Sequence, residues 1–171
     1  KVIEEEVSKA GGETYCTKIG DVNVAHEMEA SGIPFGGEPS GTWIMGDVHM
    51  TPDGTLAAAR ILEMIEDRGK TLSEMVDSLS DYPILREKME CPDERKTQVM
   101  EKLEKTVPGE FKECVDISTV DGIRLGMEDG NWVLIRPSGT EPYIRITAEA
   151  DEESQAKDLL ERAKKAMLDF L

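Results

Sequence analysis

A loop between two predicted strands carries hydrogen-bond donors typical of a phosphate site. It reads Arg-Pro-Ser-Gly-Thr-Glu-Pro over residues 136–142. The guanidinium of the arginine has a planar fork that matches phosphate oxygens, and two hydroxyls add further donors. The glycine lets the backbone curl so that free amide N–H groups at 138–140 converge on an anion. The predicted phosphate-binding residues are therefore Arg136, Ser138, Gly139 and Thr140.

The same loop also fits an ordinary tight surface turn with its arginine in solvent, because Ser-Gly-Thr turns are common. Pro137 and Pro142 stiffen its two ends. Together with the adjacent arginine, these prolines favour the functional interpretation.

A second glycine-rich loop, Gly-Gly-Glu-Pro-Ser-Gly at residues 36–41, presents one carboxylate and one hydroxyl. A carboxylate can accept hydrogen bonds from two neighbouring sugar hydroxyls, and such charge-assisted bonds are strong. The glycines permit a ligand to approach the backbone. Composition alone favours the alternative, a flexible turn with an exposed glutamate.

Both loops resemble loops of the α-D-phosphohexomutases. The string RPSGTEP, followed by YIRI and an acidic helix, is similar to the phosphate-binding loop of the last domain of that family. The string GGEPSG is similar to the sugar-recognition loop of its third domain, which implies that Glu38 and Ser40 engage ring hydroxyls. The family often has histidine where this chain has Thr42, a third candidate sugar contact. The segment 17–21 resembles another third-domain string, and its Lys18 is either a cleft residue or a solvated lysine.

The resemblance implies the phosphomutase reaction, an intramolecular phosphotransfer between hexose 1-phosphate and hexose 6-phosphate. The sugar is glucose, mannose or glucosamine, and the steps pass through a phosphoserine and a bisphosphate intermediate. Family members carry that serine in a Ser-His-Asn-Pro type loop and hold Mg²⁺ with a DxDxDR loop, and neither string occurs here. We therefore expect no catalytic residue and no metal ligand in this chain, with Mg²⁺ bound only by the full-length parent. The fragment alone should be inactive. The alternative is a stand-alone phosphosugar-binding module without catalysis.

The first half alternates helical and strand-like segments, which predicts an α/β domain over residues 1–80. By the resemblance this is the third mutase domain, truncated at its N-terminus. Leu56, Ala59, Leu62 and Ile65 recur at three-residue spacing and predict one buried helix face. The expected helices cover residues 1–10, 21–31, 53–68 and 72–79, and the expected strands cover residues 14–17, 33–35 and 43–45.

The second half, residues 81–171, predicts an α+β domain in which an antiparallel sheet is backed by two helices. Asp-Gly pairs at 121–122 and 129–130 are strong hairpin signals. The two candidate loops thus lie about 100 residues apart in different domains, and a sugar phosphate lying across the interface would meet both. The expected strands are 84–90, 113–119, 123–127, 131–135 and 143–148, and the expected helices are 93–107 and 151–171, the last with Ala156, Leu159, Leu160, Ala163 and Met167 inward.

Charge and composition limit the classes of partner that the chain is expected to bind. The chain of 171 residues has 36 acidic and 20 basic side chains, a formal charge of -16, which disfavours nucleic acids and anionic membranes. No apolar run approaches the roughly 20 residues of a membrane helix. Three isolated cysteines argue against a disulfide framework or a zinc site and for a cytoplasmic location. His26 and His49 stand alone and are expected on the surface. The expected partners are therefore the hexose phosphate and the N-terminal domains of the same parent protein.

Overall fold

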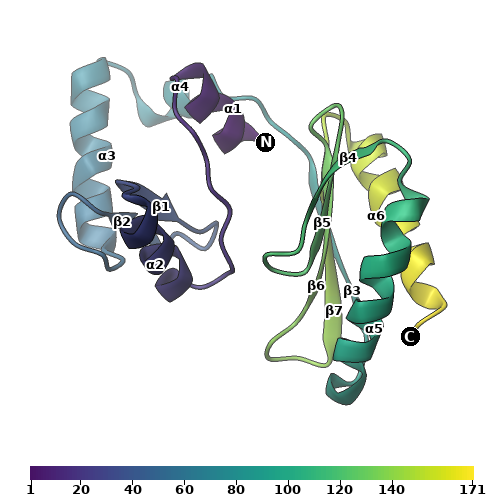
Figure 1. The fold of residues 1–171 in the computed structure, drawn as a ribbon. Helices are drawn as coiled ribbons and strands as arrows, with labels where there is room; N and C mark the ends of the chain where they lie inside the picture. The colour runs from purple at the N-terminus through teal and green to yellow at the C-terminus, as the bar shows by residue number, and fades with distance from the viewer. The chain divides into compact units, whose positions relative to one another are not determined.

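The computed structural model describes all 171 residues, which form two compact units. One unit comprises Lys1–Thr14 and Asp81–Leu171, and the other comprises Tyr15–Ser80. The elements of both are labelled in Figure 1. None of the six α-helices combines the length and apolar character needed to span a bilayer.

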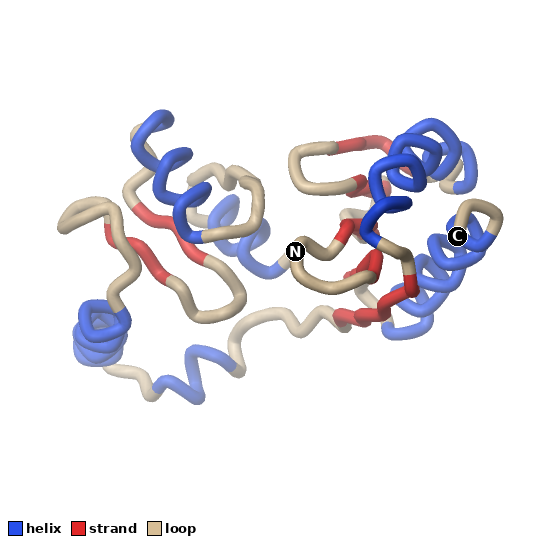
Figure 2. The backbone as a smooth tube through the Cα atoms, turned by 90° about the horizontal axis from the view of Figure 1, so that it is seen from below, coloured by secondary structure: helices blue, strands red, loops and turns tan.

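The larger unit is built on a five-stranded antiparallel sheet with the strand order β3-β7-β6-β5-β4. Helices α5 and α6 cover one face of this sheet (Figure 1, Figure 2). The Asp-Gly turns expected at 121–122 and 129–130 do connect β4 to β5 and β5 to β6. The elements of this unit are α1 (Val2–Lys9), β3 (Ile84–Glu90), α5 (Asp93–Thr106), the 3₁₀ turn η1 (Val107–Glu110), β4 (Cys114–Ser118), β5 (Ile123–Met127), β6 (Trp132–Pro137), β7 (Tyr143–Glu149) and α6 (Glu153–Leu168).

The core of this unit lies between the sheet and the two helices. Alternate residues of the strands point into it, so that Ile123, Ile135 and Ile146 form one row across β5, β6 and β7. This alternation is the expected pattern for a sheet with one covered face. The predicted inward face of the last helix is confirmed, because α6 buries Ala156, Leu159, Leu160, Ala163 and Met167. The α+β architecture predicted for the second half is therefore correct.

The smaller unit has a much smaller core. Its elements are α2 (Asp21–Ser31), β1 (Phe35–Gly37), β2 (Trp43–Met45), α3 (Gly54–Arg68) and α4 (Leu72–Val76). Strands β1 and β2 form a two-stranded hairpin, and Val24, Met28 and Ile44 are the buried residues at its contact with α2. Gly36 is required there, since a Cβ atom would lie 2.5 Å from the sulfur of Met28. The absence of a side chain at Gly36 in β1 therefore allows α2 to pack closely on the hairpin.

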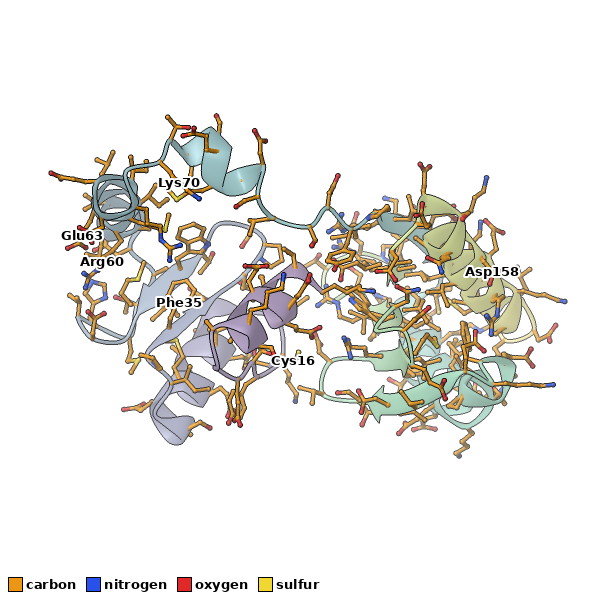
Figure 3. The ribbon with its side chains drawn as sticks, turned by 90° about the horizontal axis from the view of Figure 1, so that it is seen from above. Cys16, Phe35, Arg60, Glu63, Lys70 and Asp158 are labelled. Carbon is orange, nitrogen blue, oxygen red and sulfur yellow. The ribbon has the colours of Figure 1, made fainter.

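Two local predictions for this half are wrong. Residues 14–17 form no strand and belong to neither sheet, because strand propensity decides an element only where a sheet packs around it. The predicted buried face of α3 is also wrong: Leu62 is 67% exposed, and Ala57 is the residue that is buried instead. Arg60 and Glu63 form an ion pair on the exposed surface of the same helix (Figure 3).

The grouping of Lys1–Thr14 with the larger unit rests on specific contacts. The Tyr82 hydroxyl donates to the Glu5 carboxylate at 2.6 Å, and Glu4 pairs with Arg124 at 3.5 Å. The expected division of the chain into domains at residues 1–80 and 81–171 stays a prediction.

An acid-sensitive ion pair ties α6 to the segment before β4. Arg162 donates to the carboxylate of Glu113 and to the carbonyl oxygen of Glu110, and its guanidinium lies 4.3 Å from the centre of the Phe111 ring. The hydrogen bond from Arg162 holds the pKa of Glu113 below its ordinary value of 4.5.

We expect Glu113→Gln to lower the free energy of unfolding at pH 7, because it removes the carboxylate that Arg162 binds. A carboxylate with a lowered folded-state pKa stabilises the fold above its unfolded-state pKa, and this stabilisation is lost as the pH falls through the folded-state value. Urea unfolding at neutral and at acidic pH, about pH 3, measures the difference from wild type. Glu104→Gln, on the exposed side of α5, is the matched control. A difference of the same size at both pH values would contradict the assignment.

Candidate functional site

The predicted phosphate loop is the connection between β6 and β7. The amide of Ser138 donates to the carbonyl of Tyr143 at 2.9 Å and closes the hairpin. Residues 138–142 form no regular structure, and Ser138 is only 4% exposed. Arg136, Ser138, Gly139 and Thr140, the predicted phosphate-binding residues, therefore lie together at one hairpin end, and their role stays a prediction.

Arg136 is the last charged residue of β6, and its side chain is about four-fifths buried. Its Nη1 lies 3.2 Å from the carboxylate of Asp121, in the turn before β5. That turn packs tightly on the strand: Gly122 has φ +91°, and a Cβ atom there would lie 2.4 Å from the carbonyl oxygen of Ile135. The Asp-Gly turn was predicted only as a hairpin connection, and it also holds the guanidinium of Arg136.

One of the three predicted backbone donors of the loop is already engaged within the chain. The amide of Ser138 is bound to Tyr143 and is not available to a ligand, whereas the amides of Gly139 and Thr140 make no hydrogen bond within the chain. Gly139 does not have positive φ, so the predicted glycine-dependent curl is absent. A Cβ atom on Gly139 would meet nothing within 4 Å. The glycine therefore keeps the outer side of the loop open and allows a ligand to come close to the backbone.

Lys96 of α5 is a loop contact that the sequence analysis missed. It is 8% exposed, and its Nζ donates to the carbonyl oxygens of Ser138 (2.6 Å) and Glu141 (2.5 Å). Leaving the buried carbonyl of Ser138 without a donor would cost about 1–3 kcal/mol. A signal was present in the sequence, since Lys96 stands three and seven residues before the buried Val99 and Leu103 and so continues the apolar stripe of its helix.

Other cations surround the loop on the sheet face away from α5 and α6. Arg136 pairs in register with Arg145 on β7, which pairs in register with Lys88 on β3. Glu141 receives a hydrogen bond from Arg145 at 2.5 Å and lies 3.9 Å from Lys88. Three cations facing one loop carboxylate and Asp121 make this corner locally positive within a chain of charge -16, a suitable field for an anion.

The predicted sugar loop is the connection of the hairpin β1–β2 in the other unit. The amide of Glu38 donates to the carbonyl of Thr42 at 2.9 Å, and the hydroxyls of Ser40 and Thr42 lie 3.2 Å apart. Oε1 of Glu38 accepts a hydrogen bond from the amide of Gly20 at 2.8 Å, which fixes the carboxylate beside the first turn of α2. Lys18 is exposed. The hairpin thus gathers Glu38, Ser40 and Thr42.

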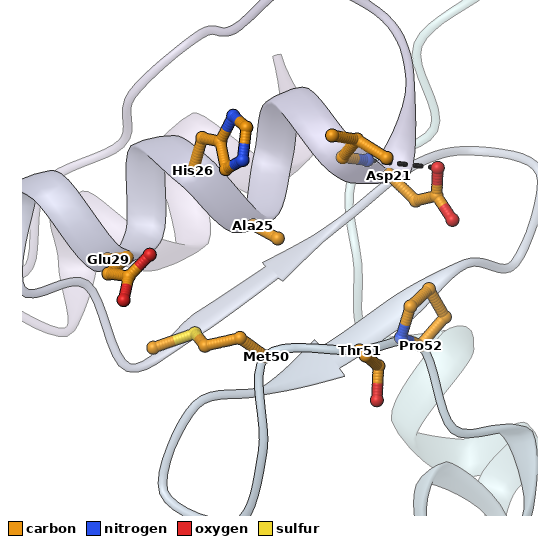
Figure 4. Close-up of a pocket in the computed structure, with 8 residues that line it drawn as sticks. Asp21, Ala25, His26, Glu29, Met50, Thr51 and Pro52 are labelled. Carbon is orange, nitrogen blue, oxygen red and sulfur yellow. Dashed lines mark hydrogen bonds between the residues drawn. The ribbon is translucent and has the colours of Figure 1, made fainter.

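A cavity of about 280 Å³ in the same unit contains none of the predicted site residues. It lies between α2 and the segment 50–52 (Figure 4), and its charged or titratable lining residues are Asp21, His26 and Glu29. Two carboxylates make it unsuited to a phosphate. His26 therefore gains no role from it.

The titratable residues offer no metal site. No group of three or more His, Cys, Asp or Glu side chains is placed to hold a metal ion. His49 is engaged locally, with Nε2 3.3 Å from the Asp53 carboxylate and Nδ1 2.8 Å from the Thr51 hydroxyl. The side chains of this chain therefore do not fit a Mg²⁺ ion.

Comparison with known proteins defines the class. Residues 1–82 match the family model described as "Phosphoglucomutase/phosphomannomutase, alpha/beta/alpha domain III", and residues 87–166 match that of the C-terminal domain. The five-stranded antiparallel sheet with its two helices makes up most of the second of these ranges. The chain belongs to the phosphoglucomutase/phosphomannomutase family, of which it contains the third-domain and C-terminal-domain regions.

Relatives of the chain are named as mutases. A probable phosphoglucosamine mutase of Methanopyrus kandleri is 50% identical over 158 residues, 92% of this chain and 34% of that protein. A phosphoglucosamine mutase of Methanococcus vannielii is 51% identical over 158 residues, 92% of this chain and 35% of that protein. A phosphoglucomutase/phosphomannomutase family protein of Burkholderia thailandensis superposes with a TM-score of 0.80 at 25% identity, over 97% of this chain and 35% of that one. The chain spans about a third of the length of these relatives.

We expect Gly122→Ala to destabilise the larger unit by more than about 1 kcal/mol, because the new methyl group clashes with the backbone of Ile135 and the residue has positive φ. Chemical unfolding followed by circular dichroism measures the change. Gly109→Ala is the control, since a Cβ atom there meets nothing within 4 Å and the residue does not have positive φ. Equal stability of the two variants would show that the 121–122 turn does not pack on Arg136 as described.

Proposed function

We propose that this chain is the substrate-recognising C-terminal part of a phosphohexomutase. The loop 136–142 binds the phosphate of a sugar phosphate, and the loop 36–42 binds the hydroxyls of its sugar ring. The observation that carries the proposal is the pair of unengaged amides at Gly139 and Thr140, which follow Arg136 closely in the sequence, with open space outside Gly139. Two amide donors and a guanidinium are the groups that a phosphate dianion needs.

The proposed phosphate contacts supply both positive charge and hydrogen-bond donors of fixed direction. The Arg136 guanidinium supplies the positive charge, and Asp121 keeps it beside the loop. The hydroxyls of Ser138 and Thr140 and the two amides supply donors of fixed position. In phosphoryl transfer most of the catalytic work is positioning and neutralisation of charge, and these residues would contribute to both.

The sugar contacts depend on the hairpin β1–β2. Glu38 has one carboxylate oxygen bound to the amide of Gly20, so its other oxygen and free lone pairs are available for ring hydroxyls. Ser40 is exposed and Thr42 is half-buried beside it. We propose that these three residues recognise the sugar. The relatives named phosphoglucosamine mutase support a glucosamine phosphate as the substrate, ahead of glucose or mannose phosphates.

The reaction belongs to the whole protein. In it, a phosphoserine outside this chain transfers its phosphoryl group to a hexose phosphate, and the resulting bisphosphate returns the phosphoryl group from its other end to the serine. Mg²⁺ is bound by that other part of the protein. The chain by itself has no phosphoryl donor and should not turn over.

A cytoplasmic location remains part of the proposal, supported by the three free thiols.

A stand-alone phosphosugar-binding module is the second candidate, favoured by the same unengaged donors. A mutase assay separates the two when a chain with the N-terminal domains in the same reading frame is compared with this one. Activity of the longer chain alone supports the mutase. Binding without activity in both supports the module.

We expect Arg136→Ala to weaken binding of glucosamine 6-phosphate by about 10- to 100-fold, the loss typical of a charged hydrogen-bond partner. His49→Ala, in the other unit and outside both loops, should leave the affinity unchanged. Calorimetric titration measures both. Equal losses in the two variants would contradict the site.

A second variant separates ligand contact from loop stability. Gly139→Ala places a methyl group in the open space outside the loop and needs no change of backbone. It should therefore weaken binding while the melting temperature stays that of wild type. Undiminished affinity would show that no ligand approaches this backbone.

A further inference from the structure

Lys96 is a charged side chain buried beneath the phosphate loop. Lysines are almost never fully buried unless paired, and the burial of this one is accounted for by three partners. Its Nζ donates to the carbonyl oxygens of Ser138 and Glu141 and lies 2.6 Å from the carboxylate of Asp93. Asp93 is largely exposed, with a side-chain exposure of 75%, so the two buried acceptors both belong to the loop.

The bond to Ser138 fixes the direction of a neighbouring donor. The carbonyl of Ser138 and the amide of Gly139 belong to one planar trans peptide unit, in which C=O and N–H point in opposite directions. Because Lys96 holds the carbonyl on the side of α5, the N–H of Gly139 points away from that helix. A Cβ atom on Gly139 meets nothing within 4 Å, so the loop is open where a ligand would approach.

The second bond holds the other end of the loop. The carbonyl oxygen of Glu141 accepts from both Lys96 and the amide of Tyr143, at 2.7 Å for the latter. With Ser138 bound to Tyr143 as well, the loop is anchored at positions 138 and 141. Gly139 and Thr140 lie between these anchors, and their amides, like that of Glu141, make no hydrogen bond within the chain.

We propose that Lys96 is the positioning residue of the phosphate loop. Lys96 directs the amides of Gly139 and Thr140 toward the phosphate and does not itself contact the phosphate. The inference rests on the proposed function of the loop. An ammonium bound to the Ser138 carbonyl also polarises that peptide unit and makes the Gly139 N–H a stronger donor. Asp93 pairs with the charge of Lys96. Lys96 therefore affects phosphate binding through the direction and polarisation of the loop amides rather than through its net charge.

The test compares Lys96→Met, Lys96→Arg and Lys105→Met in the 171-residue chain. Methionine keeps an unbranched side chain but donates nothing, whereas arginine can still donate to two carbonyls. Lys105, exposed on the same helix, is the matched control. The dissociation constant for glucosamine 6-phosphate is measured by calorimetry, and the carbonyl ¹³C shifts of Ser138 and Glu141 are measured without ligand.

We expect Lys96→Met to bind glucosamine 6-phosphate about tenfold more weakly and to change both carbonyl chemical shifts. Lys96→Arg should recover most of the affinity. Lys105→Met should bind with the affinity of wild type. If Lys96→Met does not fold, Lys96→Gln, with one shorter neutral donor group, takes its place and should give an intermediate loss. Wild-type affinity in Lys96→Met or Lys96→Gln, with binding still weakened in Arg136→Ala, would overturn the role of Lys96 alone. No binding by the wild-type chain would overturn the proposed function, and the inference with it.

Discussion

The antiparallel pairing of β6 with β7 is the constraint on which the candidate phosphate site depends. It brings Arg136 beside Arg145 and places residues 138–142 in a short connection. Both strands lie inside the five-stranded sheet, where buried Ile135, Ile144 and Ile146 hold the register, because a slip of one residue would turn these side chains out of the core. The position of the phosphate donors is therefore set by the packing of the sheet against α5 and α6.

Side chains from two other segments complete the loop. Asp121 holds the Arg136 guanidinium from one turn, and Gly122 lets that turn approach the strand. Lys96 holds the loop carbonyls from the helix. Asp121 and Lys96 thus bind polar groups of the loop, while its Gly139 and Thr140 amides stay unengaged. A site prepared in this way loses little conformational freedom when a ligand binds.

The sequence predicted the larger unit well and the smaller unit less well, for physical reasons. Strong periodicity in α6 and the two Asp-Gly turns specify local structure that agrees with the tertiary fold. In the first half of the chain, residues 14–17 have strand propensity but belong to neither sheet, and the apolar stripe of α3 exposes Leu62. Residue propensity and the apolar pattern determine a helix or strand, and its buried face, only where other parts of the chain pack against it. The loop residues were found by motif, but Lys96 was not, since its partners lie 42 and 45 residues away.

The central claim is that residues 138–142 form an anion site whose donors are already in place. An amide chemical-shift titration of the 171-residue chain, first with inorganic phosphate and then with glucosamine 6-phosphate, tests it most directly. The account predicts that both ligands shift the Gly139 and Thr140 amides, and that the sugar phosphate alone also shifts residues 38–42. Unchanged amides at Gly139 and Thr140 at millimolar concentrations of both ligands would contradict it.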